Sequence, residues 1–245
     1  MKNKKIVIPI IVIVVILLCV LGYFTYFYMH RAHQEALLVT QASTLGNLNL
    51  LTDEVDMSIT TTGDYAIVES AMKTCLKDYA DLCLDLENFN ENSGVDELIS
   101  SETYQIDGPE FTNTKNALNQ YQTELNEKID NLIEKSSKDS IMEYIQKENL
   151  DSYYTNLYEK LMFDDDTIKS LEDAKSQMQT AKDSVNSLFD SMLNIFDYLS
   201  ANKSKWFAQN GQLYFYDNNT LAEYNNLIDD LNQKISAIES LDSAE

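Results

Sequence analysis

Two histidines and three cysteines are the side chains of this sequence best suited to nucleophilic chemistry. His30 and His33 lie close to the N-terminal apolar run, whereas Cys75 and Cys83 lie well beyond it. Nucleophilic catalysis of the Ser–His or Cys–His type needs a histidine beside the nucleophile. The sequence also lacks a glycine-rich phosphate loop and a Gly-x-Ser-x-Gly motif. We therefore expect a protein that is not an enzyme, with no catalytic residue.

Two features of the sequence resemble parts of metal sites. His30 and His33 share a face at i, i+3 spacing, but no cysteine or carboxylate stands at a convincing distance to complete a coordination shell. The acidic run Asp164–Asp166 lacks the spaced oxygen ligands and the glycine turn of a calcium loop. Because this run precedes a predicted helix, we expect it to interact with the helix dipole. We expect no metal site and no cofactor.

The charge balance restricts the partners of the chain. The sequence has 40 Asp and Glu against 18 Lys and Arg, which gives a formal net charge of -22. Arg31 is the single arginine, and the only basic cluster lies at the extreme N-terminus. Binding a phosphate backbone requires clustered basic side chains, so we expect no nucleic-acid partner. An acidic surface attracts basic proteins or divalent cations, although many such surfaces only keep a protein soluble.

A β-hairpin is predicted at about residues 205–216. Asn210 and Gly211 form the dipeptide most typical of a two-residue hairpin turn, because both residues tolerate positive φ. A turn at this point fixes which residues of the two strands lie opposite each other. The predicted pairs are Trp206–Phe215 and Ala208–Leu213.

Alternation along the two strands divides the aromatic side chains between two faces. The four paired residues lie on one face, and Phe207, Tyr214 and Tyr216 lie on the other. An isolated hairpin is marginally stable in water, so one face must pack on the helices. The hairpin either covers the end of a helical bundle or presents an exposed aromatic face to a partner. The candidate partner-binding residues are Trp206, Phe207, Tyr214 and Tyr216.

The N-terminal segment has the pattern of a membrane anchor. Residues 6–29 carry no formal charge and are long enough to span a bilayer core. Three lysines precede this run and only Arg31 closely follows it, which predicts a cytoplasmic tail at residues 1–5 and an extracytoplasmic region from residue 30. A cluster of tyrosines and phenylalanines at the outer end is typical of an interfacial aromatic belt. We expect a single-pass signal-anchor in the cell membrane, with residues 6–29 in contact with lipid.

Three other origins of this apolar run are less consistent with the sequence. A cleaved signal peptide would have a shorter apolar core and small residues at a cleavage site. A lipoprotein would have small residues just before its cysteine, but two leucines precede Cys19. A pilin-like segment would have an acidic residue a few positions into the apolar helix, and residues 6–29 contain none.

The rest of the chain predicts an all-α fold apart from the hairpin. Only 6 glycines and 2 prolines occur, which favours a few long helices over folds with frequent turns. We expect a juxtamembrane helix over residues 30–62 that joins an acidic antiparallel helical bundle over residues 63–245. Apolar residues recur at three- and four-residue steps in the predicted helices at 65–89, 110–135, around 141–145, 150–161, 171–199 and 219–241.

The apolar seams leave the association state open. Heptads pack equally well within one chain or between chains, so an intermolecular coiled coil and a homo-oligomer are alternatives to an intramolecular bundle. The expected function is a non-enzymatic protein-interaction or envelope-scaffold module that binds a protein partner. The alternative is an extracytoplasmic domain that senses a small molecule between its helices and signals through a separate membrane partner.

Overall fold

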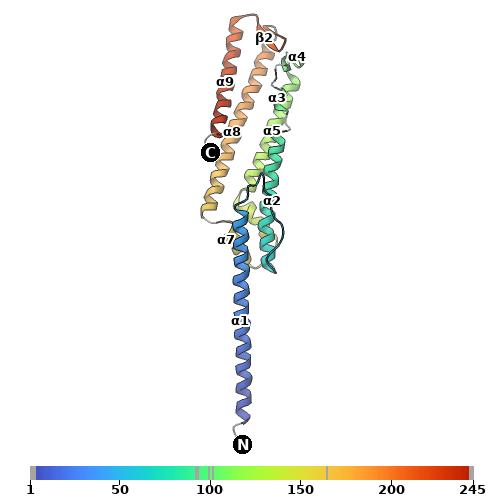
Figure 1. Cartoon of the computed structure of the whole chain (residues 1–245). Helices are drawn as coiled ribbons and strands as arrows, with labels where there is room; N and C mark the ends of the chain where they lie inside the picture. Colours follow the sequence, from blue (N-terminus) through green and yellow to red (C-terminus); the bar gives the residue numbers. More distant parts are fainter. Residues whose placement is uncertain (1–3, 92–93, 99, 101, 164, 243–245) are drawn as a thin grey trace. The chain divides into compact units, whose positions relative to one another are not determined.

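The computed structural model of the chain is mostly helical, with one small antiparallel hairpin (Figure 1). It describes residues 4–91, 94–98, 100, 102–163 and 165–242, although the side chains of residues 4–21, 96–97, 165–166 and 239–242 lie outside the description. The chain divides into two compact units. Unit 1 comprises Met1–Lys77 and Met142–Asp165, and unit 2 comprises Asp78–Ile141 and Asp166–Glu245.

The helical class and the hairpin are confirmed, and the helices after residue 63 begin and end close to the predicted positions. Two short helices, at residues 95–98 and 103–106, lie in the connection between the helices predicted at 65–89 and 110–135. The elements are α1 (Lys4–Leu45), α2 (Asp64–Glu91), α3 (Val95–Leu98), α4 (Thr103–Ile106), α5 (Thr112–Lys135), α6 (Lys138–Gln146), α7 (Ser152–Met162), α8 (Asp165–Ala201), β1 (Trp206–Gln209), β2 (Gln212–Phe215) and α9 (Asn218–Asp242).

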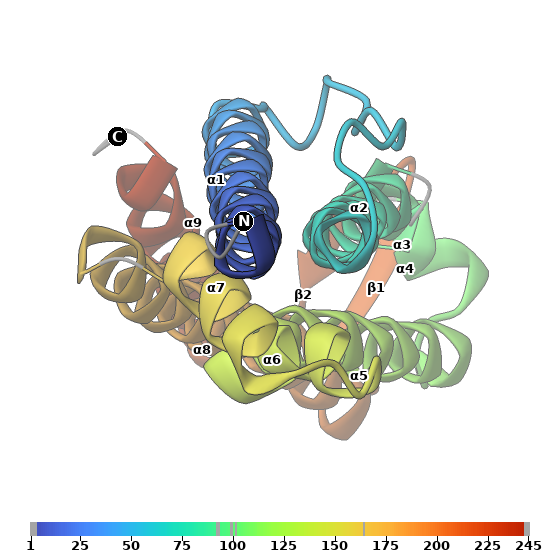
Figure 2. The same ribbon diagram turned by 90° about the horizontal axis from the view of Figure 1, so that it is seen from below.

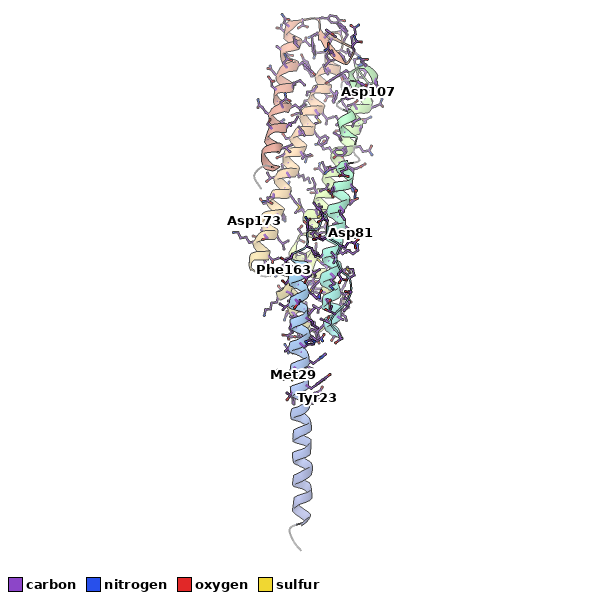
Figure 3. The ribbon with its side chains drawn as sticks, viewed as in Figure 1. Tyr23, Met29, Asp81, Asp107, Phe163 and Asp173 are labelled. Carbon is purple, nitrogen blue, oxygen red and sulfur yellow. The ribbon has the colours of Figure 1, made fainter. Side chains whose placement is uncertain are left out.

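The predicted membrane segment, residues 6–29, falls within α1. Residues 6–21 of this segment lie outside the part of the chain whose side chains the structure describes. Across the described residues, no helix has both the length and the apolar character needed to cross a bilayer. At the outer end of the segment, Tyr23 and Met29 project from α1 and expose 66% and 70% of their surface (Figure 3). The membrane anchor therefore stays a prediction.

The helix predicted over residues 30–62 is shorter than expected. α1 ends at Leu45, and residues 46–63 form an irregular segment, which we call the strap. The side-chain amide of Asn47 donates to the Ser43 carbonyl at 2.6 Å and so satisfies one of the carbonyls left open at the helix end. Asparagine and glycine at this point favour a helix end over continued helix, although the apolar spacing continues beyond it.

A buried ion pair fixes the strap to α2 within unit 1. Glu69 and Lys73 are one helical turn apart, their charged atoms are 2.9 Å apart, and their side chains are at most 1% exposed. The Glu69 carboxylate accepts hydrogen bonds from the backbone amides and hydroxyls of Thr60 and Thr61. The Lys73 ammonium also donates to the Ser58 carbonyl at 2.5 Å. Backbone groups of the strap thus form hydrogen bonds with side chains of α2 and not with one another in a helix.

The other contacts of unit 1 join α1, the first turns of α2 and α7. α7 runs beside α1 (Figure 2). Gln34 of α1 is buried and accepts a hydrogen bond from the Thr62 amide at 2.8 Å, which fixes the end of the strap to α1. Apolar side chains with no more than 1% exposure fill the interior of this unit: Leu38, Val68, Met72, Ile145 and Tyr158.

The long helices of unit 2 are antiparallel, as predicted. The side-chain hydrogen bonds between neighbouring helices show this direction, because the residue number rises along one helix as it falls along its neighbour. Such pairs join α2 to α5, α5 to α8 and α8 to α9. They are Asp85–Lys128 and Asn90–Tyr121, then Lys115–Asp197 and Asp130–Lys182, then Ser191–Asp230 and Tyr198–Glu223.

The core of unit 2 lies between α5, α8 and β1, and side chains of α9 pack against it. The seam predicted on α8 is fully buried only in its second half, since Leu171, Met178 and Val185 are half-buried whereas Met192 and Leu199 are buried. The core residues are Phe111, Leu118, Leu125, Ile129, Phe189, Met192, Ile195, Phe196, Leu199 and Trp206.

Candidate partner-binding site

The hairpin forms with the predicted register. β1 and β2 pair Trp206 with Phe215 and Ala208 with Leu213, as expected from a turn at Asn210 and Gly211. Both turn residues have positive φ, 53° and 74°, which is the backbone conformation that the two-residue turn requires. Below the strands, the Tyr216 amide donates to the Lys205 carbonyl at 2.9 Å and closes the hairpin at its open end.

Trp206 attaches the hairpin to the core of unit 2. Its side chain is 6% exposed, and the indole N–H donates to the Leu199 carbonyl at the end of α8 at 2.8 Å. Its ring stacks on Phe111, with 5.8 Å between the ring centres and 17° between the planes. Trp206 therefore differs from the other three candidate residues, because its side chain anchors the hairpin to the core and is not exposed to a partner.

The segment before α5 makes room for Trp206. A side chain at Gly108 would place its Cβ 2.4 Å from the Tyr104 carbonyl oxygen and 3.2 Å from the Trp206 ring, so only glycine fits there. Phe111 is fully buried although its φ of 52° is uncommon for a residue with a side chain. Its ring contacts Tyr104 and Phe196 as well as Trp206. Sequence patterns did not indicate this cluster.

Asp107 stabilises the start of α5 beside that cluster. Its carboxylate accepts hydrogen bonds from the Thr114 amide (2.7 Å) and hydroxyl (2.8 Å) and from the Asn113 side chain (2.9 Å). Burial disfavours the charged carboxylate, but these hydrogen bonds outweigh it and lower the pKa of Asp107 below its ordinary value. Figure 3 labels Asp107 at this end of the helix.

The turn of the hairpin has a second attachment, to α4. With its amide oxygen turned toward the hairpin, Gln105 accepts hydrogen bonds from the backbone amides of Asn210 (2.9 Å) and Gly211 (2.6 Å). These bonds satisfy two amides that the tight turn leaves open. The hairpin is thus held at its base by Trp206 and at its tip by Gln105.

The outer face of the hairpin carries three exposed rings, which we call the aromatic face: Phe207, Tyr214 and Tyr216. Their exposed fractions are 38%, 41% and 68%. Phe207 stacks on Tyr214, with 5.0 Å between ring centres, and also contacts Tyr216 at 5.5 Å. Rings that are already packed against one another lose little conformational freedom when a partner binds.

Unit 1 contains a pocket of about 290 Å³, which we call the α1–α2 pocket. It is lined by side chains of α1, the end of the strap, the start of α2 and α7, and it contains charges of both signs. A second pocket of about 210 Å³ lies between α2 and α6 and the residues after it. The residues that line the α1–α2 pocket are Phe27, His30, Arg31, Thr62, Gly63, Asp64, Tyr65 and Tyr154.

A hydrogen-bonded cluster lies behind the α1–α2 pocket. The Arg31 side chain donates to Glu35 at 2.8 Å, and its guanidinium carbon lies 4.0 Å from the centre of the Tyr153 ring. The Tyr153 hydroxyl also donates to Glu35 and lies 3.3 Å from the Tyr65 hydroxyl. Hydrogen bonds from Tyr153 and then Arg31 lower the pKa of Glu35, and the bond to Glu35 raises the pKa of Arg31. Both side chains of the pair therefore stay charged at neutral pH.

The histidines and cysteines whose side chains the structure describes have different surroundings. His30 lines the α1–α2 pocket, whereas His33 is exposed on α1. Burial raises the pKa of the half-buried Cys83 thiol, which makes it less nucleophilic. Within the described residues, no three His, Cys, Asp or Glu side chains gather in a geometry that could hold a metal ion. The acidic run at 164–166 lies outside the described side chains.

The fold and the site define a mostly helical protein with an aromatic hairpin face at one end of an antiparallel helical unit. Comparisons with known proteins, made by family model, by sequence and by structure, find no match.

Proposed function

We propose that this chain is a single-pass membrane protein whose region from residue 30 onward lies outside the cytoplasm and acts, without catalysis, as a protein-interaction or envelope-scaffold module. The uncharged run of residues 6–29, preceded by three lysines, has the length and flanking charge of a signal-anchor. α1 is one continuous helix from Lys4 to Leu45. Exposed rings at the outer end of the run suit the headgroup region: Tyr23, Phe24, Tyr26, Phe27 and Tyr28.

Protease accessibility tests this topology. A tag after Glu245 should be cleaved by external protease on intact cells, or on protoplasts where a cell wall blocks access. A tag on the N-terminus should stay protected in the same cells and serves as the internal control. Protection of the C-terminal tag, or loss of the chain from the membrane fraction, would contradict the anchor and its orientation.

The aromatic face is the observation that supports a binding role. Three exposed rings project from a hairpin that is held at both ends. A group of exposed aromatic side chains of this kind is typical of an interaction site. The chain that carries them has a formal charge of -22. Aromatic faces attract Lys and Arg side chains, and an acidic surface attracts basic segments. The partner proposed here is therefore a protein segment that carries lysine or arginine.

Site-specific photocrosslinking in living cells tests this partner. A photoreactive side chain at Tyr216 should give one dominant adduct, and the same group at Leu221 of α9, which is also exposed, should not. The double substitution Phe207→Ser and Tyr214→Ser should remove the adduct. Purified partner should then bind the double variant at least about tenfold more weakly, the effect of losing one or two aromatic contacts. The matched control is Leu221→Ser, because Leu221 is 39% exposed, close to Phe207 and Tyr214.

Two results would contradict the proposal. The first is an unchanged adduct in the double variant while circular dichroism shows an intact fold. The second is an adduct with another copy of the same chain, which would indicate a homo-oligomer in place of a basic partner. A double variant that loses helical content is replaced by the single variant Tyr214→Ser, because Tyr214 is 41% exposed and the photoreactive group at residue 216 stays in place.

A second candidate function is the sensing of a small soluble molecule, and the smaller pocket of unit 1 favours it. This pocket has a volume of about 210 Å³ and includes the Tyr144 ring, with the Lys147 ammonium 4.9 Å from its centre. This volume is below the range of about 300–1,000 Å³ that is typical of ligand pockets, so the molecule sensed would have to be small. A metabolite that raises the melting temperature of the full chain, but not of Lys147→Gln, would support sensing over scaffolding.

A further inference from the structure

The α1–α2 pocket combines charges of both signs with aromatic walls. Arg31 and His30 approach it from α1, and Asp64 lines it at the start of α2. A purely anionic ligand would be repelled by Asp64, and a purely cationic ligand would leave the N–H donors of Arg31 that do not bond to Glu35 without an acceptor. A ligand that carries an anion and an amine in one small group satisfies both sides. The mixed lining therefore favours a zwitterion.

The positive side of the pocket is fixed before any ligand arrives. Arg31 is held by its hydrogen bond to Glu35 and by contact with the Tyr153 ring. A guanidinium has five N–H donors, so the bond from Nε to Glu35 leaves capacity for an anion. His30 adds at least one further N–H in either protonation state. Phosphate and carboxylate both match a planar guanidinium, and phosphate offers more oxygens to the neighbouring donors.

The opposite side of the pocket suits an amine. Asp64 supplies a carboxylate, and Tyr65 and Tyr154 supply rings that pack edge to face, with 5.1 Å between their centres. Phe27 adds a third ring to the lining. Ammonium groups bind well against several aromatic rings beside a carboxylate. These rings are placed by the protein interior, because Tyr65 is only 7% exposed.

We propose that the α1–α2 pocket binds a phosphate group with a tethered amine, as in a phosphoethanolamine lipid headgroup. The assignment to a lipid rests on the proposed function, because the predicted membrane span ends at Met29 and the pocket is lined by Phe27, His30 and Arg31. Side chains at that point of the helix lie at the depth of the lipid phosphates. The pocket thus binds selectively one type of lipid headgroup in the outer leaflet, next to the membrane anchor.

Soluble probes test the chemistry without a bilayer. The full chain in a maltoside detergent is titrated calorimetrically with glycerophosphoethanolamine, glycerophosphoglycerol, ethanolamine and glycine. Glycerophosphoethanolamine should bind at least about tenfold more tightly than the other three, since each of them lacks the phosphate or the amine. His30→Gln and Asp64→Asn should each weaken its binding by about tenfold. The matched controls are His33→Gln and Glu54→Gln, which change similar groups outside the pocket and should leave the affinity unchanged.

A lipid experiment distinguishes a membrane headgroup from a free metabolite. The full chain is released from vesicles of equal phosphatidylethanolamine and phosphatidylglycerol, and retained lipid is identified by native mass spectrometry. The unsubstituted chain should retain phosphatidylethanolamine preferentially, and Asp64→Asn should lose that preference. Binding of the soluble probe without lipid preference would overturn the lipid assignment. Binding of ethanolamine or glycine as tight as that of glycerophosphoethanolamine would overturn the phosphate–amine assignment itself.

The test of the pocket can be distinguished from a failure of the proposed membrane anchor. The soluble titration does not depend on a membrane, so it reads the pocket even where the protease test contradicts the proposed topology. His30 and Asp64 are solvent-exposed side chains, and their substitution should leave the helical circular dichroism unchanged. Arg31→Gln is unsuitable as the main variant because it also breaks the Glu35 and Tyr153 contacts.

Discussion

The two units of this chain are stabilised by different kinds of interior. Unit 2 has an apolar core in which Trp206 is the most polar member, and its single N–H is bonded to the Leu199 carbonyl. Unit 1 places a complete ion pair, Glu69 and Lys73, at 1% exposure or less. In unit 2 the long helices satisfy their own backbone groups, and the buried polar side chains of its described part are uncharged: Thr103, Thr114, Ser136, Ser191 and Thr220. The irregular strap of unit 1 has amides to satisfy, and a buried carboxylate does this.

This difference has a consequence for specificity. A buried ion pair contributes little net stability because desolvation offsets the attraction, but removing one partner leaves a costly unpaired charge. An apolar core contributes stability directly through burial. We infer that the Glu69–Lys73 pair determines where the strap lies, whereas the core around Phe111 determines how strongly unit 2 resists unfolding.

The largest expected effect is the loss of Glu69. Glu69→Ala leaves the Lys73 ammonium buried without its carboxylate and should destabilise unit 1 by about 3–5 kcal/mol. Hydrogen exchange measured by mass spectrometry on the full chain should show faster exchange in residues 58–73. The second half of α8, in unit 2, should keep its protection.

The double substitution Glu69→Ala and Lys73→Met is the matched control. It removes both charges, so it should be less destabilising than Glu69→Ala alone. A double variant as damaged as the single variant would show that the strap needs the carboxylate for its hydrogen bonds and not for charge balance. Exchange that rises equally in both units would contradict the separate character of their interiors.

The next effect concerns the apolar interior of unit 2. Leu199 is fully buried, and Leu199→Ala should destabilise the unit by about 3 kcal/mol through lost burial and a cavity. Because Trp206 is the only tryptophan, its fluorescence reports unfolding of unit 2 alone. The midpoint of urea unfolding followed by this signal should fall, with an unchanged slope.

Leu221→Ala provides the comparison for that experiment. Leu221 is 39% exposed on α9, so its truncation should change stability by less than about 0.5 kcal/mol. An equal shift for both variants would mean that the α8 interior is not the main source of stability in unit 2.

The sequence was sufficient for elements whose signals are local. Apolar positions repeat at three- and four-residue steps through α2, α5, α8 and α9, and each helix was predicted within a few residues of its observed ends. Asn210 and Gly211 predicted the hairpin and its register, because a two-residue turn leaves one pairing. The alternation of the strands predicted which residues share a face, but it did not indicate that the candidate Trp206 is buried in the core.

The failures share a physical cause, which is dependence on contacts distant in sequence. Apolar spacing continues past Leu45, so helix was expected, but Thr60 and Thr61 instead bond to Glu69. The position of Trp206 depends on Phe111, almost a hundred residues earlier, and neither position carries a local signal for the other. The α1–α2 pocket draws its lining from three separate segments of the chain, so no single stretch could predict it.

The smallest expected effect is a pH dependence that both units share, although the groups responsible differ. Burial disfavours charge on Glu69 and Asp107, but hydrogen bonds from Lys73 and Thr61 to Glu69, and from Thr114 and Asn113 to Asp107, outweigh it and lower both pKa values. A carboxyl with a lowered pKa in the folded state stabilises the protein above its ordinary pKa, and this contribution is lost as the pH falls through the folded value. Stability should therefore be level near neutral pH and decline below about pH 4.5, where unfolded carboxyls begin to take up protons.

Asp107→Asn assigns the part of this decline that belongs to unit 2. Asparagine keeps one acceptor oxygen for Thr114 but cannot lose a proton, so the variant should be about 1 kcal/mol less stable at neutral pH. Its tryptophan-detected urea midpoint should also depend less on pH between about 5 and 3 than that of the unsubstituted chain. The exchange rate of residues 58–73 in unit 1 should keep its full acid dependence, because Glu69 is unchanged. A variant whose tryptophan signal retains the original pH profile would show that other carboxyls control unit 2 in acid. Glu69 in unit 1 would then be the one group of this pair to which a share of the acid dependence is assigned.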